Sequence, residues 1–201
     1  MQKNQPQIQN WSRRRIIGSL AGLAGLGISL QLLAQPGRMR AEAAISPELL
    51  SSPLDKPLPD TPITGSDGLI DLADLAGQPL LVNFWASWCA PCVQELPALE
   101  QAATALADEQ IIGKQARVLL VCIDRGGQPV ADAFLQRRAI AVSAALQAYD
   151  PKASWPRALG LTGLPVTLWI SADQKQAWQH IGPADWASPT ALQQMRQLLA
   201  S

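Results

Sequence analysis

Two cysteines, Cys89 and Cys92, stand three positions apart in the stretch VNFWASWCAPCVQELPAL, residues 82–99. Strand-forming residues precede the pair, and a helical pattern follows it. Three kinds of site use such a pair: half of a metal centre, a structural disulfide, or a dithiol that exchanges with other disulfides. The rest of the chain has to decide among them.

The supply of other ligands argues against a metal centre. A structural zinc site needs four ligands, and beyond the pair the chain offers Cys122 and His180. Cys122 lies within an apolar run, and His180 is near the other end of the chain. A structural disulfide that closes so short a loop adds little stability. A pair placed between a strand and a helix favours the working dithiol, with no metal.

The position of the pair predicts different roles for its two sulfurs. Cys89 is expected at the helix N-terminus, where free N–H groups and the helix dipole favour a thiolate and lower the pKa below about 8.5. Cys92 is expected one turn further and more buried. Cys89 then attacks a partner disulfide, and Cys92 resolves the mixed disulfide. Pro91 is tolerated in the first helical turn.

Alternating strand and helix patterns follow from Leu69 onward. We predict a mixed α/β sheet with helices on both faces, and residues 129–160 as an insert in a smaller core. The expected strands are a short one at 69, buried ones at 79–85 and 116–124, an edge strand at 144–150, and a hairpin of 164–171 with 175–182. The expected helices are 90–109, bent at Pro97, 129–139, a turn or two at 153–160, and 188–200.

The N-terminal 43 residues differ from the rest of the chain. They hold six basic residues and one acid, and residues 16–34 carry no charge. This order predicts either an export signal cleaved after Ala43 or a retained membrane anchor. The stretch SRRRII resembles the twin-arginine signal. Residues 44–62 are predicted to form a linker, and 63–201 the folded domain.

Charge distribution bears on partners and location. Beyond residue 43 the chain has ten basic and fifteen acidic residues, a net charge of −5, which gives no support for nucleic-acid binding. Both interpretations of the N-terminal segment place the domain in the periplasm or on the outer face of the cytoplasmic membrane.

The motif NFWASWCAPCVQELPAL, together with TGLPVTLWI further along, resembles the thioredoxin superfamily. Within it the chain is similar to the TlpA/ResA/DsbE-like thiol-disulfide oxidoreductases, which have an N-terminal extension and a central insert. The resemblance covers residues 55–200. It implies a thioredoxin-like fold whose working group is the redox-active disulfide of Cys89 and Cys92, with no other cofactor.

The same resemblance suggests a substrate-binding surface. It implies that Pro165 follows a cis peptide bond and faces the cysteines, and that the backbone of Leu164 pairs with an extended substrate segment. Val166 replaces the threonine that the family more often has. Trp88 is interpreted either as a contact for partners, which the resemblance favours, or as a partly exposed core aromatic.

Two polar residues near the pair are singled out. Asn83 stands where thioredoxin has a buried aspartate, as is common in TlpA-like proteins. Glu95 matches a glutamate of ResA-like members and shares a helical face with Cys92. Glu95 is therefore expected either to shuttle the Cys92 proton with a raised pKa, or merely to complement the helix dipole from the first turn.

Four further residues receive structural interpretations. Cys122 is expected to be an inert buried thiol, and Trp85 to pack in the core. Trp186, within a segment that resembles TlpA-like proteins, is expected to cap the sheet. His180 is expected to be a surface or satisfied side chain rather than a copper ligand.

The resemblance implies a reducing enzyme that keeps cysteine pairs of apocytochrome c or copper-site proteins as thiols. Electrons then come from a membrane donor of the thioredoxin-fed kind. Two alternatives remain. A peroxiredoxin-type peroxidase needs a different motif, and a non-enzymatic thioredoxin-like copper-binding assembly factor uses cysteines one position further apart with a distal histidine.

Overall fold

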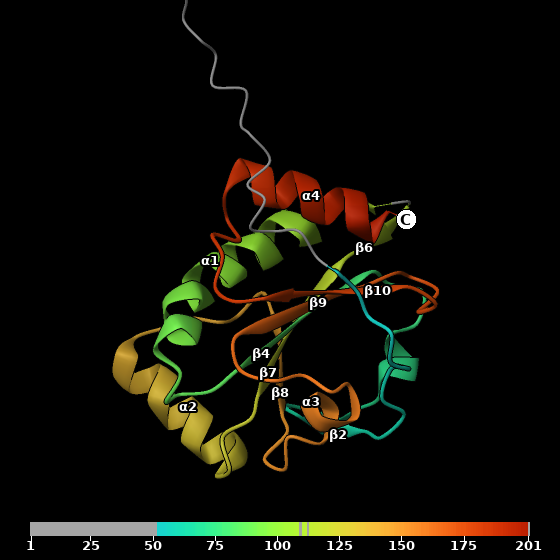
Figure 1. Cartoon of the computed structure of the whole chain (residues 1–201). Helices are drawn as coiled ribbons and strands as arrows, with labels where there is room; N and C mark the ends of the chain where they lie inside the picture. Colours follow the sequence, from blue (N-terminus) through green and yellow to red (C-terminus); the bar gives the residue numbers. More distant parts are fainter. Residues whose placement is uncertain (1–51, 109, 112, 201) are drawn as a thin grey trace, which may run out of the picture. The chain divides into compact units, whose positions relative to one another are not determined.

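The computed structural model of this chain describes residues 52–108, 110, 111 and 113–200 (Figure 1). The predicted export signal and its cleavage site after Ala43 lie outside these residues. Within this part of the chain, none of the helices combines the length and the apolar character that crossing a bilayer requires.

The described residues form an eight-stranded mixed sheet in the order β1-β10-β9-β4-β7-β8-β2-β3. β4, β7 and β8 run parallel to one another, and the other neighbours pair antiparallel. The strands are β1 Ser52–Pro53, β2 Ile63–Gly65, β3 Gly68–Ile70, β4 Leu80–Trp85, β7 Arg117–Cys122, β8 Leu146–Tyr149, β9 Val166–Ile170 and β10 Ala177–Ile181, with a separate small ladder of β5 Gln110–Ile111 and β6 Lys114–Gln115.

Helical segments cover both faces of the sheet, as predicted (Figure 1). α1 (Ala90–Ala107), α2 (Gly127–Arg138) and α4 (Pro189–Leu199) pack on one face, whereas α3 (Ser154–Ala158) and a 3₁₀ turn (Leu72–Leu75) pack on the other. β4 is buried along its whole length and divides its side chains between the two cores. Leu81 and Trp85 face the first core, and Val82 and Phe84 the second, which is the alternation of a strand.

The predicted edge position of β8 is wrong. β8 pairs with β7 on one side and with β2 on the other, through Thr64↔Tyr149 and Gly65↔Ala148. The β2–β3 hairpin therefore extends the sheet beyond β8. The β8 sequence shows a strand but does not specify which segment pairs with its outer side.

The described end of the predicted linker runs along the domain. β1 pairs with β10 through Ser52↔Gln179 and Pro53↔Trp178, and the Leu54 N–H donates to the Ala177 carbonyl at 2.9 Å. Leu54 also packs against the second core. These contacts join residues 52–54 to the sheet at β10.

Candidate active site

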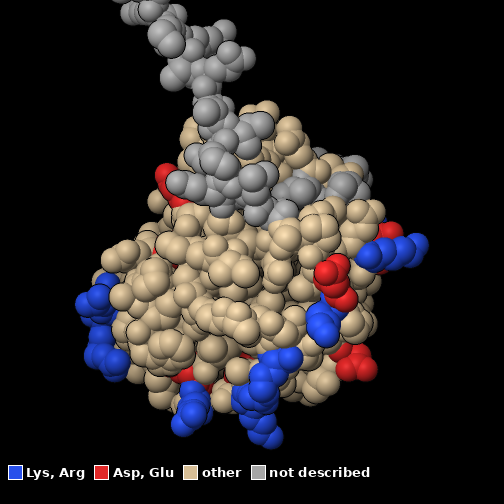
Figure 2. Space-filling view, in the orientation of Figure 1, with Lys and Arg blue, Asp and Glu red and all other residues tan. Residues whose placement is uncertain are grey.

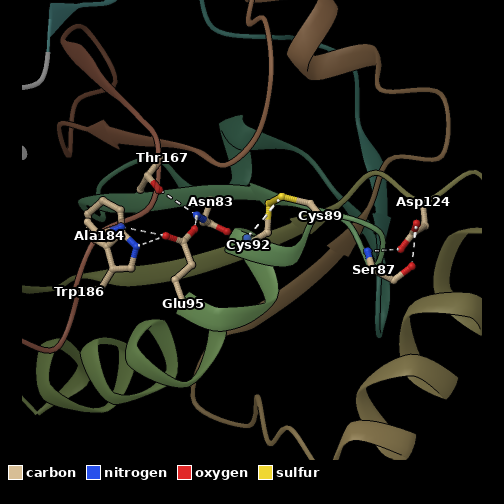
Figure 3. Close-up of a disulfide and its surroundings, with 9 residues drawn as sticks. All are labelled: Asn83, Ser87, Cys89, Cys92, Glu95, Asp124, Thr167, Ala184 and Trp186. Carbon is tan, nitrogen blue, oxygen red and sulfur yellow. Dashed lines mark hydrogen bonds between the residues drawn. A yellow bond between two sulfur atoms is a disulfide. The ribbon is translucent and has the colours of Figure 1, made fainter.

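Cys89 and Cys92 form a disulfide at the N-terminus of α1, with an S–S distance of 2.00 Å (Figure 3). Cys89 is the N-cap residue, and its Sγ accepts a hydrogen bond from the Cys92 N–H at 3.4 Å. Cys89 is 7% exposed and Cys92 is fully buried. Pro91 lies in the first turn. The predicted placement of both sulfurs is therefore confirmed: one at the helix end, the other one turn inside.

An aspartate holds the loop that precedes the cysteines. Asp124, just beyond β7, accepts hydrogen bonds from the Ser87 N–H at 2.9 Å and the Ser87 hydroxyl at 3.1 Å (Figure 3). The Cys89 N–H donates to the Ala86 carbonyl at 3.1 Å. The sequence does not predict this role of Asp124. Its local signal is a carboxylate at the end of the buried strand expected at 116–124.

Cys122 is buried at the C-terminal end of β7, 1% exposed, and pairs in register with Trp85. Its thiol donates to Asp124 Oδ2 at 3.3 Å. Burial, together with the negative charge of Asp124, raises the pKa of the Cys122 thiol to about 12. The predicted burial of Cys122 is confirmed, and at neutral pH the thiol stays protonated.

Glu95 lies beneath the disulfide and is 4% exposed. Its carboxylate accepts hydrogen bonds from Asn83 Nδ2 at 2.8 Å, Trp186 Nε1 at 2.9 Å and the Ala184 N–H at 3.2 Å (Figure 3). Burial raises the pKa of Glu95 above its ordinary 4.5, although the three hydrogen bonds act in the opposite direction.

The interpretation of Glu95 as a dipole partner in the first turn is wrong. The first turn of α1 contains no acid, because the helix begins at Ala90 and Glu95 falls in its second turn. The helix dipole acts mainly within the first turn. A buried carboxylate on the Cys92 face of the helix is left, and its role as a proton shuttle stays a prediction.

Asn83 connects Glu95 to the neighbouring strand. It is fully buried on β4, and its Nδ2 also donates to Thr167 Oγ1 on β9 at 2.8 Å. Neither an amide nor a hydroxyl titrates near neutral pH. Glu95 is therefore the titratable member of this trio.

Trp186, in the segment between β10 and α4, packs beside Glu95. It is fully buried, and its ring lies 5.7 Å from that of Trp169 and 5.5 Å from that of His180. His180 is 5% exposed and meets both tryptophans edge-on. The prediction that Trp186 caps the sheet is confirmed by its contact with Trp169 on β9, but no local pattern indicates its bond to Glu95.

An open groove borders the disulfide. Trp88 is 69% exposed, and the Leu164–Pro165 peptide bond is cis, as predicted. Pro165 O accepts from the Gly182 N–H at 3.0 Å. Within the described residues, neither the N–H nor the C=O of Leu164 has a backbone partner. The groove is lined by Trp88, Cys89, Ala90, Pro91, Ile123, Ala153, Pro156, Arg157, Leu161, Gly163 and Leu164.

Two observations decide the family: this arrangement of strand, dithiol, helix and cis-proline, and the match of residues 53–196 to the Redoxin family model. The chain belongs to the Redoxin family. Trp85, as predicted, packs in the core of this Redoxin domain, 2% exposed and 6.4 Å from the Phe134 ring.

Two relatives that match most of this Redoxin chain are named as thiol:disulfide interchange proteins. The chain is 31% identical to the thiol:disulfide interchange protein DsbE of Allochromatium vinosum, over 71% of this chain and 77% of that protein. It is 30% identical to a solved structure of a candidate DsbE from Chlorobium tepidum, with a TM-score of 0.58 over 73% of this chain and 96% of that one.

Other relatives match over shorter stretches. The chain is 54% identical to the thioredoxin of Rhodospirillum rubrum, but only over 19% of this chain and 38% of that protein. Similarly, 50% identity to the thioredoxin-like protein YneN of Bacillus subtilis covers 22% of that protein.

Proposed function

We propose that this protein is a thiol-disulfide oxidoreductase that acts on cysteine pairs of other proteins. The observation that carries this proposal is the position of Cys89: at the N-terminus of α1, bonded to the buried Cys92, and on the wall of an open groove. Unpaired N–H groups at a helix end stabilise a thiolate, which is the reactive form in exchange. The DsbE relatives support the same reaction.

Exchange proceeds in two balanced steps. The Cys89 thiolate attacks one sulfur of the partner disulfide, forms a mixed disulfide and releases the other partner sulfur as a thiolate. The Cys92 thiolate then attacks the Cys89 sulfur, closes the Cys89–Cys92 disulfide and releases the partner as a dithiol. Two electrons pass from this protein to the partner. A dithiol protein restores the reduced state by the reverse exchange.

Glu95 is proposed to accept the Cys92 proton before the second step. Cys92 is fully buried, so its thiol needs a nearby base to ionise. Glu95 lies three positions along the same helix, on the same face. Burial raises the pKa of Glu95, and a carboxylate with a raised pKa takes a proton more readily at neutral pH.

Leu164 and Trp88 are proposed to hold the partner. Within the described residues the N–H and C=O of Leu164 have no backbone partner, and they suit an extended segment that pairs with this backbone like an added strand. Trp88 supplies an exposed aromatic surface beside Cys89. The partner sulfur then lies between the groove wall and the helix end.

The direction and setting of the reaction are also proposed. The basic, apolar and small-residue order of residues 1–43 supports export across the cytoplasmic membrane. In that compartment the protein reduces cysteine pairs of apocytochrome c or copper-site proteins and receives electrons from a membrane donor of the thioredoxin-fed kind.

Cysteine substitutions test the reaction. Reduced protein should open the disulfides of insulin or of an apocytochrome peptide, Cys89→Ser should abolish this, and Cys92→Ser should accumulate the mixed disulfide, which mass spectrometry detects. Activity retained in Cys89→Ser would disprove the proposal. A reduction potential near that of strong oxidants, about −120 mV, would reverse its direction.

A further inference from the structure

A second hollow adjoins the groove on the side away from Glu95. The groove and this hollow share Trp88, Ile123, Ala153 and Arg157. Three basic residues surround the hollow, and we call them the cationic rim: Arg125 after β7, Lys152 before α3, and Arg157 on α3.

The rim cations are exposed and unpaired. All three side chains are exposed to solvent. In the part of the chain that the structure describes, the only salt bridge joins Lys175 to Asp173, at 3.6 Å. Lys and Arg side chains project from the lower end of the molecule in Figure 2, the end at which α2 and α3 lie in Figure 1. Arg157 also lines the groove that contains Cys89, whereas Arg125 and Lys152 line the adjoining hollow. Three exposed cations gathered there stand out in a domain that has more acids than bases.

Two acids close to the rim point inward. Asp124 is 4% exposed and holds Ser87, and Asp150 is 2% exposed. The carboxylate of Asp150 accepts from the Ser154 N–H at 2.9 Å, the Ser154 hydroxyl at 2.8 Å and the Trp155 N–H at 2.8 Å. These carboxylates are occupied within the domain, whereas the cationic groups face the water from which a partner arrives.

The opposite side of the dithiol has the reverse character. The hollow near Glu95 is lined by Gln94, Glu95, Ala98, Pro183, Ala184 and Asp185. Its one exposed charge is Asp185, because Glu95 is buried, and none of the residues that line it is basic. The approach to Cys89 therefore has exposed cations on the α3 side and one exposed acid, Asp185, on the other.

We propose that the cationic rim recognises acidic side chains in a partner protein, next to the cysteine that the partner presents to Cys89. This inference rests on the proposed exchange function and names its substrate class. Charges of opposite sign steer encounter and raise association rates about 10-fold to 1,000-fold at low salt. In the proposed complex the partner's acidic residues lie along α3. Because this contact orients the partner, its backbone pairs with Leu164 in a single orientation.

Three peptides that are identical except for two flanking residues test the preference. Each peptide contains one internal disulfide, flanked by two glutamates, two glutamines or two lysines, and reacts with the reduced full-length protein. At about 0.01 M salt, where the Debye length is about 30 Å, the acidic peptide should react at least about 10-fold faster than the basic one. At about 1 M salt, with a Debye length of about 3 Å, the difference should nearly vanish.

Substitutions locate the preference. The triple variant Arg125→Gln/Lys152→Gln/Arg157→Gln should lose the preference for the acidic peptide. A matched control, Lys114→Gln/Arg137→Gln/Lys175→Gln, removes three exposed cations outside the groove and should retain it. Equal rates for the three peptides, or a preference that survives in the rim variant, would overturn the inference. Rim-dependent binding to anionic vesicles without any peptide preference would overturn it as well.

A neutral small disulfide separates this inference from the proposed function. Reduced wild-type protein and the control variant should open hydroxyethyl disulfide at equal rates, because that reagent carries no charge. The rate of the rim variant with this reagent serves as the reference by which its own peptide rates are divided. If none of the three proteins opens this reagent or the disulfide of any peptide, the exchange function itself fails. If all open it but the peptides are not distinguished, only the rim inference fails.

Discussion

The indole Nε1 of Trp186 donates a hydrogen bond to Glu95 Oε2 at 2.9 Å, across 91 positions of the sequence (Figure 3). Trp186 lies between β10 and α4, and Glu95 lies on α1 below the dithiol. The last part of the domain therefore helps to set the charge state of a buried carboxylate three positions after Cys92 on the same helix. Together with Asn83, it fixes the orientation of that carboxylate.

Removal of the Glu95 charge should slow the second step of exchange. In Glu95→Gln the mixed disulfide should resolve about 100-fold more slowly near neutral pH, because Cys92 loses its base. In wild type the resolution rate should rise with pH through the raised pKa of Glu95, and the variant should lack this rise. Quenched mass spectrometry of the mixed disulfide measures both. An unchanged pH profile would refute the proton role.

Substitution of Trp186 should shift that profile rather than remove it. Trp186→Phe deletes one of the hydrogen bonds that lower the pKa of Glu95, so the pKa should rise further and the rise in rate should move to higher pH. The lost bond and the smaller ring should also reduce the free energy of unfolding by about 1–3 kcal/mol. Trp88→Phe, at an exposed position, is the control and should leave the midpoint of the pH profile in place.

Cys122 should take no part in exchange. Since burial raises the pKa of its thiol to about 12, iodoacetamide at pH 8 should label Cys89 in the reduced folded protein and leave Cys122 unmodified. Cys122→Ala should retain the exchange rate. Labelling of Cys122 in the native state, followed by peptide mass mapping, would contradict this expectation.

Glu100 should stabilise the segment that precedes β8. Its carboxylate accepts from the N–H groups of Ser143 at 2.6 Å, Ala144 at 2.6 Å and Ala145 at 3.1 Å. Partial burial raises the pKa of Glu100, but these bonds and the Ser143 hydroxyl outweigh it, and the pKa falls below 4.5. The stabilisation is then present above pH 4.5 and lost as pH falls through the folded pKa.

The measurement for Glu100 is denaturant unfolding of wild type and Glu100→Gln. Because the site is partly exposed, we expect the variant to lose only about 1 kcal/mol at pH 7. The two proteins should converge at a pH below the lowered pKa. A difference that persists unchanged into acid would show that the charge is not responsible.

Much of the fold follows from local patterns in the sequence. The uncharged run around Val82 predicts a strand that is buried on both faces. The spacing of Cys89 and Cys92 directly before a helical pattern predicts one sulfur at the helix N-terminus and the other one turn further. Glycine also gives a local signal for the end of a helix. Gly160 follows α3 and has a positive φ of 69°, a conformation that suits glycine. Such features depend on residues close in the chain.

Contacts between distant segments could not be predicted in this way. The pairing of β2 with β8 joins positions about 85 residues apart by their numbers, Thr64 and Tyr149, and no local pattern specifies it. The bond from Trp186 to Glu95 is of the same kind. Asp124 had a local signal, but only the parallel pairing of β4 with β7 shows that it reaches Ser87.

In the part of the chain that the structure describes, the outer strands of the sheet are short: β1 has two residues and β3 has three. An unpaired strand edge can recruit the same edge of another molecule, and a short edge offers few free N–H and C=O groups for such self-association. β1 also covers the five-residue strand β10 with an element that contains Pro53, which cannot donate a backbone hydrogen bond. The domain therefore protects itself against aggregation through its sheet while the groove beside Cys89 stays open to partners.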